Sequence, residues 1–285
     1  MTVKPQSFSP KMILCPLDLS AASRTVLSWA RMFAETYQAK LELLYAEWPE
    51  YPPYFLLSQE AELEARAELH RAALGQELAK LAREALGPTL SPGIAVVEGS
   101  AVEVILNRVA SAKPDLIVMG SHGRSGISRL RLGSVAENVV RATSTPTLVA
   151  KAHANGAPAK ISRVLCPVNF TERAYRSLEL SAEIAGAFQA QLVVLHAVEE
   201  GASDLSAKHQ ELCQWVPAEV RTHCDLVEVV HHGNAAEQIL LAARDRAADL
   251  IILEAGRRPF LDFAILGATA ERVIRHADSA VLVIP

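Results

Sequence analysis

The sequence predicts an α/β protein built from two tandem doubly wound domains. Half of its 285 residues are hydrophobic but only 5% are aromatic, a balance that favours an α/β protein over an all-β sandwich. Short apolar segments alternate with helical segments along the chain, and this alternation indicates parallel strands joined by right-handed crossovers. The same succession occurs twice, and the chain is long enough for two domains.

Three pairs of similar segments define the repeat: 12–20 with 163–171, 39–47 with 190–198, and 115–151 with 249–285. Matched residues are 151 positions apart in the first two pairs and 134 apart in the third. The second copy is therefore shorter, and the missing residues fall between its second and third strands.

Between the copies lies a stretch with the composition of a linker. KAHANGAPAKIS, at residues 151–162, is rich in Ala, Gly, Pro and Asn, which is typical of connecting segments. We expect a first domain over residues 1–152, a linker over 153–160 and a second domain over 161–285.

Each strand of the first copy is a short apolar run, and we expect strands at 13–17, 41–46, 94–97, 116–119 and 147–150. Helices are expected at roughly 21–38, 58–86 and 101–112 and after Gly133. Ser20 is the predicted N-cap of the first helix, and Gly87-Pro88 is the stop signal of the second. The second copy is expected to repeat this order, with Thr171 as the first N-cap.

Ligands of doubly wound sheets bind beyond the carboxyl ends of the strands, where the strand order reverses. In the first copy that edge carries Asp18, Ala46, Gly99 and the loop GSHGRSGISRLRLGS at 120–134. Glycine lets a backbone N–H approach an anion closely. Gly133-Ser134 precedes an expected helix over 135–142, whose free N–H groups and dipole form an anion site.

The loop by itself leaves two interpretations open. The Ser134 hydroxyl can add a hydrogen bond to an anion, and Arg124, Arg129 and Arg131 are available to neutralise a polyphosphate. The patterns G-x-x-x-x-G-K-[ST] and G-x-G-x-x-G are both absent. Glycines before a helix also form ordinary turns, so phosphate binding and a structural turn both remain.

The spacing G-x2-G-x9-G-[ST] in this loop resembles the nucleotide loop of the universal stress protein family. MGSHGRSGISRLRLGSVAENVV is similar to that loop along its whole length, CPLDLS at 15–20 resembles the family's first-strand element, and TPTLVAK resembles its last strand. The likeness covers nearly the whole chain as two copies. It implies a five-stranded parallel sheet flanked by helices in each domain, of the adenine nucleotide alpha hydrolase-like type.

The resemblance also implies that the first domain binds ATP, which a magnesium ion can accompany through phosphates and water. Asp18 would meet the ribose, and backbone near Leu17 and at Ala46 would hold the adenine. Met119 would border the nucleoside. The phosphates would lie on Gly120, Gly123, Gly133, Ser134 and Val135, with Arg124 beside them. His122 could touch a phosphate or position a water, or be an exposed turn residue.

The second copy departs from this pattern at four positions: opposite Asp18, Gly120, Gly123 and Ser134 stand Asn169, Glu254, Arg257 and Ala268. A carboxylate beside a triphosphate is repulsive, so we expect no ATP in the second domain in the manner of the family. Arg257 and Arg258 either bind another anion or are solvated surface residues.

Dimers of the family commonly pair their last strands antiparallel. The resemblance therefore implies an intrachain pseudo-dimer, in which TLVAK at 147–151 pairs with VLVIP at 281–285 and the second domain covers the edge strand of the first. A homodimer of whole chains is compatible with this arrangement.

A group of metal-ligating residue types lies between residues 209 and 232: His209, Cys213, His223, Cys224, His231 and His232. Cys and neutral His bind zinc, but the spacing matches no standard zinc module. We interpret the group as core cysteines and surface histidines, and a metal site remains the alternative.

Three functions remain after these observations. We expect a nucleotide-liganded stress-response or signalling module without efficient catalysis, since no nucleophile–base set or carboxylate pair is apparent. The alternatives are a slow ATPase, and a regulatory partner-binding protein with a metal or anion in its second domain.

Charge and hydropathy exclude other classes of protein. The net charge of −4, without a basic block, argues against nucleic-acid binding. We expect no signal peptide in the first residues, because their apolar run is short, and no apolar run approaches the roughly 20 residues of a membrane span. We therefore expect a cytoplasmic protein that binds no membrane.

Overall fold

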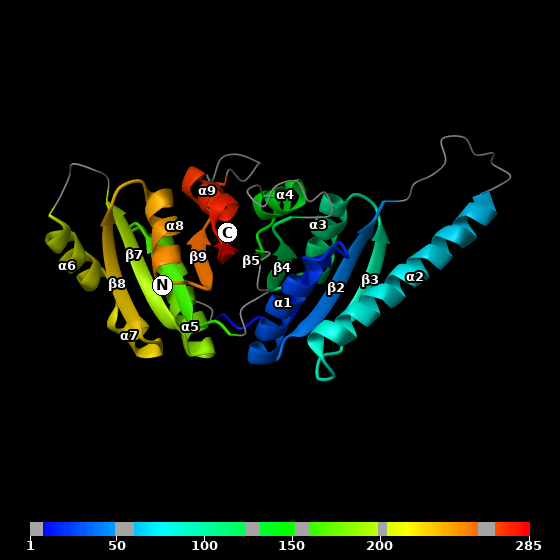
Figure 1. Ribbon diagram of the computed structural model, residues 1–285, viewed down its shortest axis with the longest axis horizontal. Coiled ribbons are helices and arrows are strands. Elements are labelled where there is room, and N and C mark those ends of the chain that lie inside the picture. The colour runs from blue at the N-terminus through cyan, green and yellow to red at the C-terminus, as the bar shows by residue number, and fades with distance from the viewer. Residues whose placement is uncertain (1–7, 49–59, 123–131, 152–159, 199–203, 256–265) are drawn as a thin grey trace.

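The structure, a computed structural model, describes residues 8–48, 60–122, 132–151, 160–198, 204–255 and 266–285 (Figure 1). Within these residues the strands form a single sheet of ten, in the order β3-β2-β1-β4-β5-β10-β9-β6-β7-β8. The two copies of the repeat are the two halves of this sheet.

The first half contains β1 (Met12–Leu17), α1 (Ser23–Tyr37), β2 (Lys40–Glu47), α2 (Glu60–Leu86), β3 (Gly93–Glu98), α3 (Ala101–Ala112), β4 (Leu116–Gly120), α4 (Ser134–Ala142) and β5 (Thr147–Ala150). The second half contains β6 (Arg163–Val168), α5 (Glu172–Phe188), β7 (Gln191–Val198), α6 (Leu205–Trp215), α7 (Ala218–His223), β8 (Leu226–His232), α8 (Ala235–Asp245), β9 (Leu250–Glu254), α9 (Ala268–His276) and β10 (Ala280–Ile284).

Each half is a five-stranded parallel sheet with the same strand order. In the first half β1 lies between β2 and β4, both parallel to it, and the corresponding β6 lies between β7 and β9. The order reverses beside β1 and beside β6, because the chain moves to one side of that strand and then to the other. The predicted fold class, two doubly wound α/β domains in tandem, is confirmed.

Helices cover both faces of the sheet, and the core forms two layers. The layer on one face contains Leu27 of α1, Leu78 of α2 and Leu178 of α5. The layer on the opposite face contains Val139 of α4 and Val273 of α9. Strand residues alternate between the two layers, as a sheet buried on both faces requires.

The central strands of the two halves carry buried thiols at matching places. Cys15 of β1 and Cys166 of β6 are free cysteines without exposed surface. Burial raises the pKa of the Cys166 thiol to about 12 and raises that of Cys15 further still. Both side chains therefore act as small uncharged hydrophobic residues.

The two copies start their first helix differently. Thr171 is the N-cap of α5, as predicted, and its Oγ1 accepts a hydrogen bond from Ala174 N–H at 3.2 Å. The prediction that Ser20 caps α1 is wrong: the helix begins at Ser23 with Ala22 as N-cap. The physical reason is Asp18, whose Oδ1 accepts the Ser20 N–H at 3.0 Å and organises the turn instead.

The connection between the second and third strands also differs between the copies. In the first half it contains α2, which is followed by Gly87 with the positive φ of 73° that favours glycine. In the second half two short helices, α6 and α7, replace it. A residue that precedes a proline is disfavoured in the helical conformation, and Val216-Pro217 separates the two helices.

The last strands of the two halves join the sheet into one. β5 and β10 pair antiparallel, and Leu148 is the partner of Leu282. These residues occupy the same position in the two copies, 134 residues apart. The pairing therefore has the local symmetry of a twofold axis that passes between them.

Helix contacts on both sides of the sheet follow the same local symmetry. The rings of Tyr37 in α1 and Phe188 in α5, which are equivalent positions, lie 6.2 Å apart. On the opposite face Arg141 of α4 donates to Glu271 of α9 at 3.0 Å, and the reciprocal pair, Arg275 with Glu137, lies at 3.9 Å.

Lys151 breaks this symmetry. Its buried Nζ donates to the carbonyl of Ile274 near the end of α9, where a cation complements the helix dipole. Burial lowers the pKa of Lys151 to about 8, against the opposing effect of Asp278.

In the described residues no helix is both long and apolar enough to span a bilayer.

Candidate functional site

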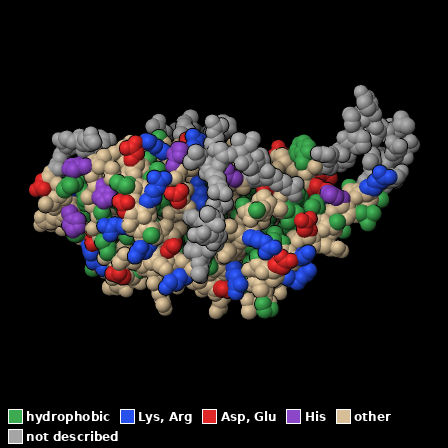
Figure 2. All heavy atoms as spheres, in the orientation of Figure 1, with side chains coloured by type: hydrophobic (Ala, Val, Ile, Leu, Met, Phe, Trp, Pro, Cys, Tyr) green, Lys and Arg blue, Asp and Glu red, His purple; other side chains and the backbone are tan. Residues whose placement is uncertain are grey.

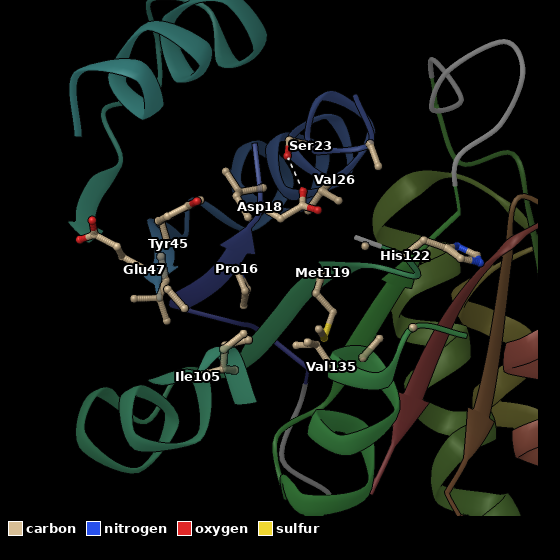
Figure 3. A pocket seen from close by; sticks show the side chains of 18 of the residues that line it. Pro16, Asp18, Ser23, Val26, Tyr45, Glu47, Ile105, Met119, His122 and Val135 are labelled. Carbon is tan, nitrogen blue, oxygen red and sulfur yellow. Dashed lines mark hydrogen bonds between the residues drawn. The ribbon is translucent and has the colours of Figure 1, made fainter. Parts of the chain in front are cut away.

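A cavity of about 880 Å³ opens at the carboxyl ends of the strands in the first half (Figure 3). Its walls come from the β1–α1 turn, the end of β2, α2, α3, the end of β4 and the first turn of α4. It therefore lies where the strand order reverses, and its volume is in the range of small-molecule sites.

The cavity brings together nine of the residues that the sequence singles out: Leu17, Asp18, Ala46, Met119, Gly120, His122, Gly133, Ser134 and Val135. They come from four separate segments of the chain. The other two candidates, Gly123 and Arg124, lie outside the described residues.

One end of the cavity is the N-terminus of α4. Gly133 is the N-cap, with an extended conformation at φ −65°, and its N–H donates to Ser121 O at 2.7 Å. A Cβ at Gly133 would lie only 3.1 Å from that oxygen, so glycine favours the close approach of the two backbones. The N–H groups of Ser134 and Val135 belong to the first turn, where helices leave donors without intrahelical acceptors. This end of the cavity suits an anion.

Asp18 lies at the end of β1, between α4 and the end of β2. Its Oδ1 accepts hydrogen bonds from Ser20 N–H at 3.0 Å and from the Ser23 hydroxyl at 3.2 Å. Figure 3 shows the Asp18–Ser23 bond at the cavity wall, above Met119. The turn that replaces the expected Ser20 cap therefore also orients this carboxylate.

His122 is part of the cavity wall. The ring Nδ1 lies 2.8 Å from the hydroxyl of Ser121, which is buried. Figure 3 shows the ring pointing away from the centre of the cavity, on the side opposite Tyr45 and Glu47. In this conformation the imidazole does not face a ligand bound between Asp18 and Val135.

The sequence reasoning missed several residues of the wall: Tyr45, Glu47, His70, Leu74, Ile105 and Ser121. Glu47 could have been found, because it is a charged residue that ends a strand at a buried position. His70 and Leu74 of α2 could not have been found, because the sequence pattern of a surface helix does not indicate which of its residues lie over the end of a strand.

Comparison with known proteins identifies the family. The family model for universal stress proteins matches residues 10–151 and again residues 160–285. The chain belongs to the universal stress protein family. A universal stress protein of Methanocaldococcus jannaschii is 30% identical over 141 residues, covering 50% of this chain and 82% of the relative. One from Thermus aquaticus is 31% identical over 147 residues, covering 50% of this chain and 98% of the relative.

Solved universal stress protein structures match the full length of the fold. A universal stress protein from Archaeoglobus fulgidus superposes with a TM-score of 0.72 at 23% identity, covering 96% of this chain and 97% of that one. A putative universal stress protein from Pseudomonas aeruginosa gives a TM-score of 0.67 at 21% identity, with coverages of 97% and 93%. The arrangement of two such units in one chain therefore has structural precedent.

In the second universal stress protein region, other side chains occupy the corresponding sheet edge. The guanidinium of Arg173 donates to Oε1 of Glu254 at 3.2 Å, and Glu254 occupies the position that corresponds to Gly120 of the first region. Arg173 stands where the first region has Ala22, a residue of the cavity wall. The second region thus places two large charged side chains where the first has glycine and alanine.

Aromatic rings fill more of the same edge. The ring of Phe170 lies 4.2 Å from that of His196 and 5.5 Å from that of Trp215. The Nδ1 of His196 lies 2.9 Å from Val168 O, which holds the imidazole against the end of β6. His196 corresponds to Tyr45 of the first region.

The group of histidines and cysteines in the second region does not converge on one point. Within the described residues no group of three or more His, Cys, Asp or Glu side chains could hold a metal ion. His209 and Cys213 do contact each other, with 3.7 Å between Nδ1 and Sγ, one turn apart in α6. Burial, followed by the charge of Asp225, raises the pKa of the Cys224 thiol to about 11. Figure 2 shows histidine side chains spread over the visible face of this half.

Proposed function

We propose that the first universal stress protein region binds ATP and that the chain is a nucleotide-liganded stress-response or signalling module without efficient catalysis. The observation that carries the proposal is the cavity itself. It joins an oriented carboxylate, Asp18, to the N-terminus of α4 along one sheet edge.

The wall of the cavity fits the three parts of a nucleoside triphosphate. The first-turn N–H groups of α4 at Ser134 and Val135 would receive phosphate oxygens, because they are donors at the positive end of a helix dipole. Asp18 would accept hydrogen bonds from ribose hydroxyls. Apolar residues, among them Pro16 and Ile105, would enclose the base. A magnesium ion would be held mainly by phosphates and water.

Slow hydrolysis of ATP is the alternative function, and His122 is the residue that bears on it. A general base must reach the attacking water. The ring of His122 points away from the cavity, and its Nδ1 is engaged with Ser121 (Figure 3). This arrangement favours binding over turnover.

For the second region we propose a structural role, that of a built-in dimer partner. Its strand β10 pairs with β5, and an uncovered β5 would be an apolar edge prone to aggregation. The Arg141–Glu271 bond and its reciprocal pair support the same arrangement. The Arg173–Glu254 ion pair argues against ATP at the equivalent edge. Whole chains can still associate as homodimers.

The test is to count nucleotides per chain. The full-length protein, purified from cells, is heat-denatured, and the released small molecules are identified by mass. Protein freed of nucleotide is then titrated with ATP by calorimetry. The proposal expects one adenine nucleotide and one calorimetric site per chain. Two sites would contradict the assignment of the second region, and none would contradict ATP binding altogether.

A steady-state assay of phosphate release separates binding from turnover. The proposal expects no sustained release above a protein-free control. Steady release that disappears in the variant Ser134→Asp would instead establish the slow ATPase.

A further inference from the structure

Helix α6, at the outer end of the second half (Figure 1), carries a histidine and a cysteine side by side. His209 and Cys213 are four residues apart, so their side chains lie on the same face of the helix. The Nδ1 of His209 lies 3.7 Å from the Sγ of Cys213. His209 is exposed and Cys213 is half-buried, so an ion in solvent has access to both atoms.

The separation of the two atoms matches that of two ligands on one zinc ion. Zinc binds cysteine sulfur at about 2.3 Å and histidine nitrogen at about 2.0–2.1 Å, with tetrahedral angles. Two such ligand atoms lie about 3.5–3.6 Å apart. The observed 3.7 Å is within about 0.2 Å of this value. The pair therefore needs little movement to bind one ion with both side chains.

The turn of α6 that carries the pair is held by its neighbours. Leu212 is fully buried in the core. Arg221 of α7 donates to the carbonyl of Cys213 at 2.9 Å. The adjacent Lys208 is paired with Glu211 at 2.6 Å, which offsets its charge beside the pair. The backbone of this turn is therefore fixed before an ion binds.

The other three thiols of the chain are poorer ligands. Cys15 and Cys166 have no exposed surface. Burial raises the pKa of the Cys224 thiol to about 11, and a metal ion binds the thiolate. The neighbouring His223 has its Nδ1 at 2.7 Å from the carbonyl of Glu219. Residues 223–224, although also a histidine beside a cysteine, are therefore less suited to a metal ion.

We propose that His209 and Cys213 form a two-ligand site for zinc or another borderline-soft divalent ion. The imidazole binds through Nδ1, with its proton on Nε2, and the thiol binds as the thiolate. Binding therefore forms one nitrogen–metal and one sulfur–metal bond and releases the thiol proton to solvent. Water takes the remaining coordination positions, because two protein ligands are fewer than a closed structural site has. This site is independent of nucleotide binding in the first region.

Titration of the full-length chain with Zn²⁺ and with Co²⁺ tests the proposal. The protein carries no histidine tag, is kept reduced, and is freed of nucleotide, because phosphates also bind divalent ions. We expect one ion per chain by calorimetry, and a sulfur-to-cobalt charge-transfer band in the near-ultraviolet absorption of the Co²⁺ form. Excess Mg²⁺ should not compete, since it prefers oxygen ligands.

The variants His209→Ala and Cys213→Ser should each weaken Zn²⁺ binding by at least about tenfold, since even the partners of metal ligands contribute about 10- to 100-fold. Cys213→Ser should also remove the charge-transfer band. His223→Ala and Cys224→Ser are the matched controls, and both should keep the wild-type affinity and the band. An unchanged melting temperature in the absence of metal shows that the α6 variants fold.

The outcomes decide between this site and binding elsewhere. A wild-type chain that does not bind Zn²⁺ would overturn the proposal. So would Zn²⁺ binding that both α6 variants retain, or a Co²⁺ form without the sulfur band. Equal losses in the α6 variants and in the controls would mean that the ion lies between the two pairs, and would overturn the two-ligand site. None of these results bears on ATP binding in the first region.

Discussion

Replacing Ser134 with aspartate tests whether phosphates lie at the N-terminus of α4. Ser134 is the first residue of the helix and is exposed, so an aspartate fits there without clashing. An acidic residue in the first turn stabilises a helix by about 0.3–1 kcal/mol through the helix dipole. Folding should therefore be unaffected or slightly improved, while the site changes from attracting anions to repelling them.

The loss of ATP affinity can be estimated from the charges. Two unit charges about 4 Å apart interact with about 4 kcal/mol at an effective dielectric constant of about 20. Solvent exposure of the residue reduces this value, and we take roughly 2–3 kcal/mol. Because each 1.4 kcal/mol is a factor of ten, the dissociation constant for ATP should rise about 30- to 150-fold. Salt should shrink the effect by screening.

The second region supplies a matched control for this variant. Ala268 is the first residue of α9, is exposed, and follows Gly267 as Ser134 follows Gly133. Ala268→Asp should leave the calorimetric affinity for ATP unchanged. If Ser134→Asp binds ATP as the wild type does, with an unaltered melting temperature, the phosphates do not lie on α4. If Ala268→Asp weakens ATP binding equally, the effect comes from the net charge of the protein and not from a phosphate beside residue 134.

Three further predictions concern stability, measured by denaturant unfolding of the full chain. Gly133→Ala should lower the free energy of unfolding by about 1–3 kcal/mol, because the new Cβ would lie 3.1 Å from a backbone oxygen. Gly267→Ala, whose Cβ would meet no described atom within 4 Å, should be near neutral. Equal losses in the two variants would contradict the close approach of the backbones at Gly133. Burial lowers the pKa of Lys151 from 10.5 to about 8, so the unfolded chain binds the proton more tightly than the folded chain. The free energy of unfolding of the wild type, relative to that of Lys151→Met, should therefore rise between pH 8 and pH 10.5 by up to about 3 kcal/mol. A difference that does not change with pH would contradict a lowered pKa for this amine. A double-mutant cycle of Arg141→Ala and Glu271→Ala should give a coupling free energy below about 1 kcal/mol, since both side chains are about 30% exposed. A larger coupling free energy would mean that this ion pair contributes substantially to the contact between the two halves.

Much of the fold could be predicted from the sequence because its determinants are local. Apolar runs such as the one that forms β1 mark buried parallel strands, and the end of α2 at Gly87 follows from the conformational freedom of glycine. The cap of α1 could not be predicted, because Ser20 and Asp18 both offer side-chain oxygens and the competition is decided by the geometry of the turn.

The candidate site also has one part that the sequence predicts and one part that it does not. The glycine spacing around Gly133 and the acid at Asp18 are readable along the chain, since parallel strands bring their carboxyl ends to one edge. The position of His70 beside Glu47 could not be read from the sequence, because the helical pattern of α2 does not state which of its turns lies over the cavity. Sequence spacing identifies the end that suits phosphate, and only packing identifies the wall opposite it.

What the sequence by itself determined is the repeat, the alternation of strands and helices, and the difference between the glycines of the first copy and the charged residues of the second. Tertiary structure decided how the copies meet: Leu148 opposite Leu282 in one continuous sheet, with Arg141 reaching Glu271 across the junction. It also decided that Glu254 pairs with Arg173. The physical reason is that strand register and ion pairing are set by groups far apart in the chain, whose approach depends on the packing of the whole core.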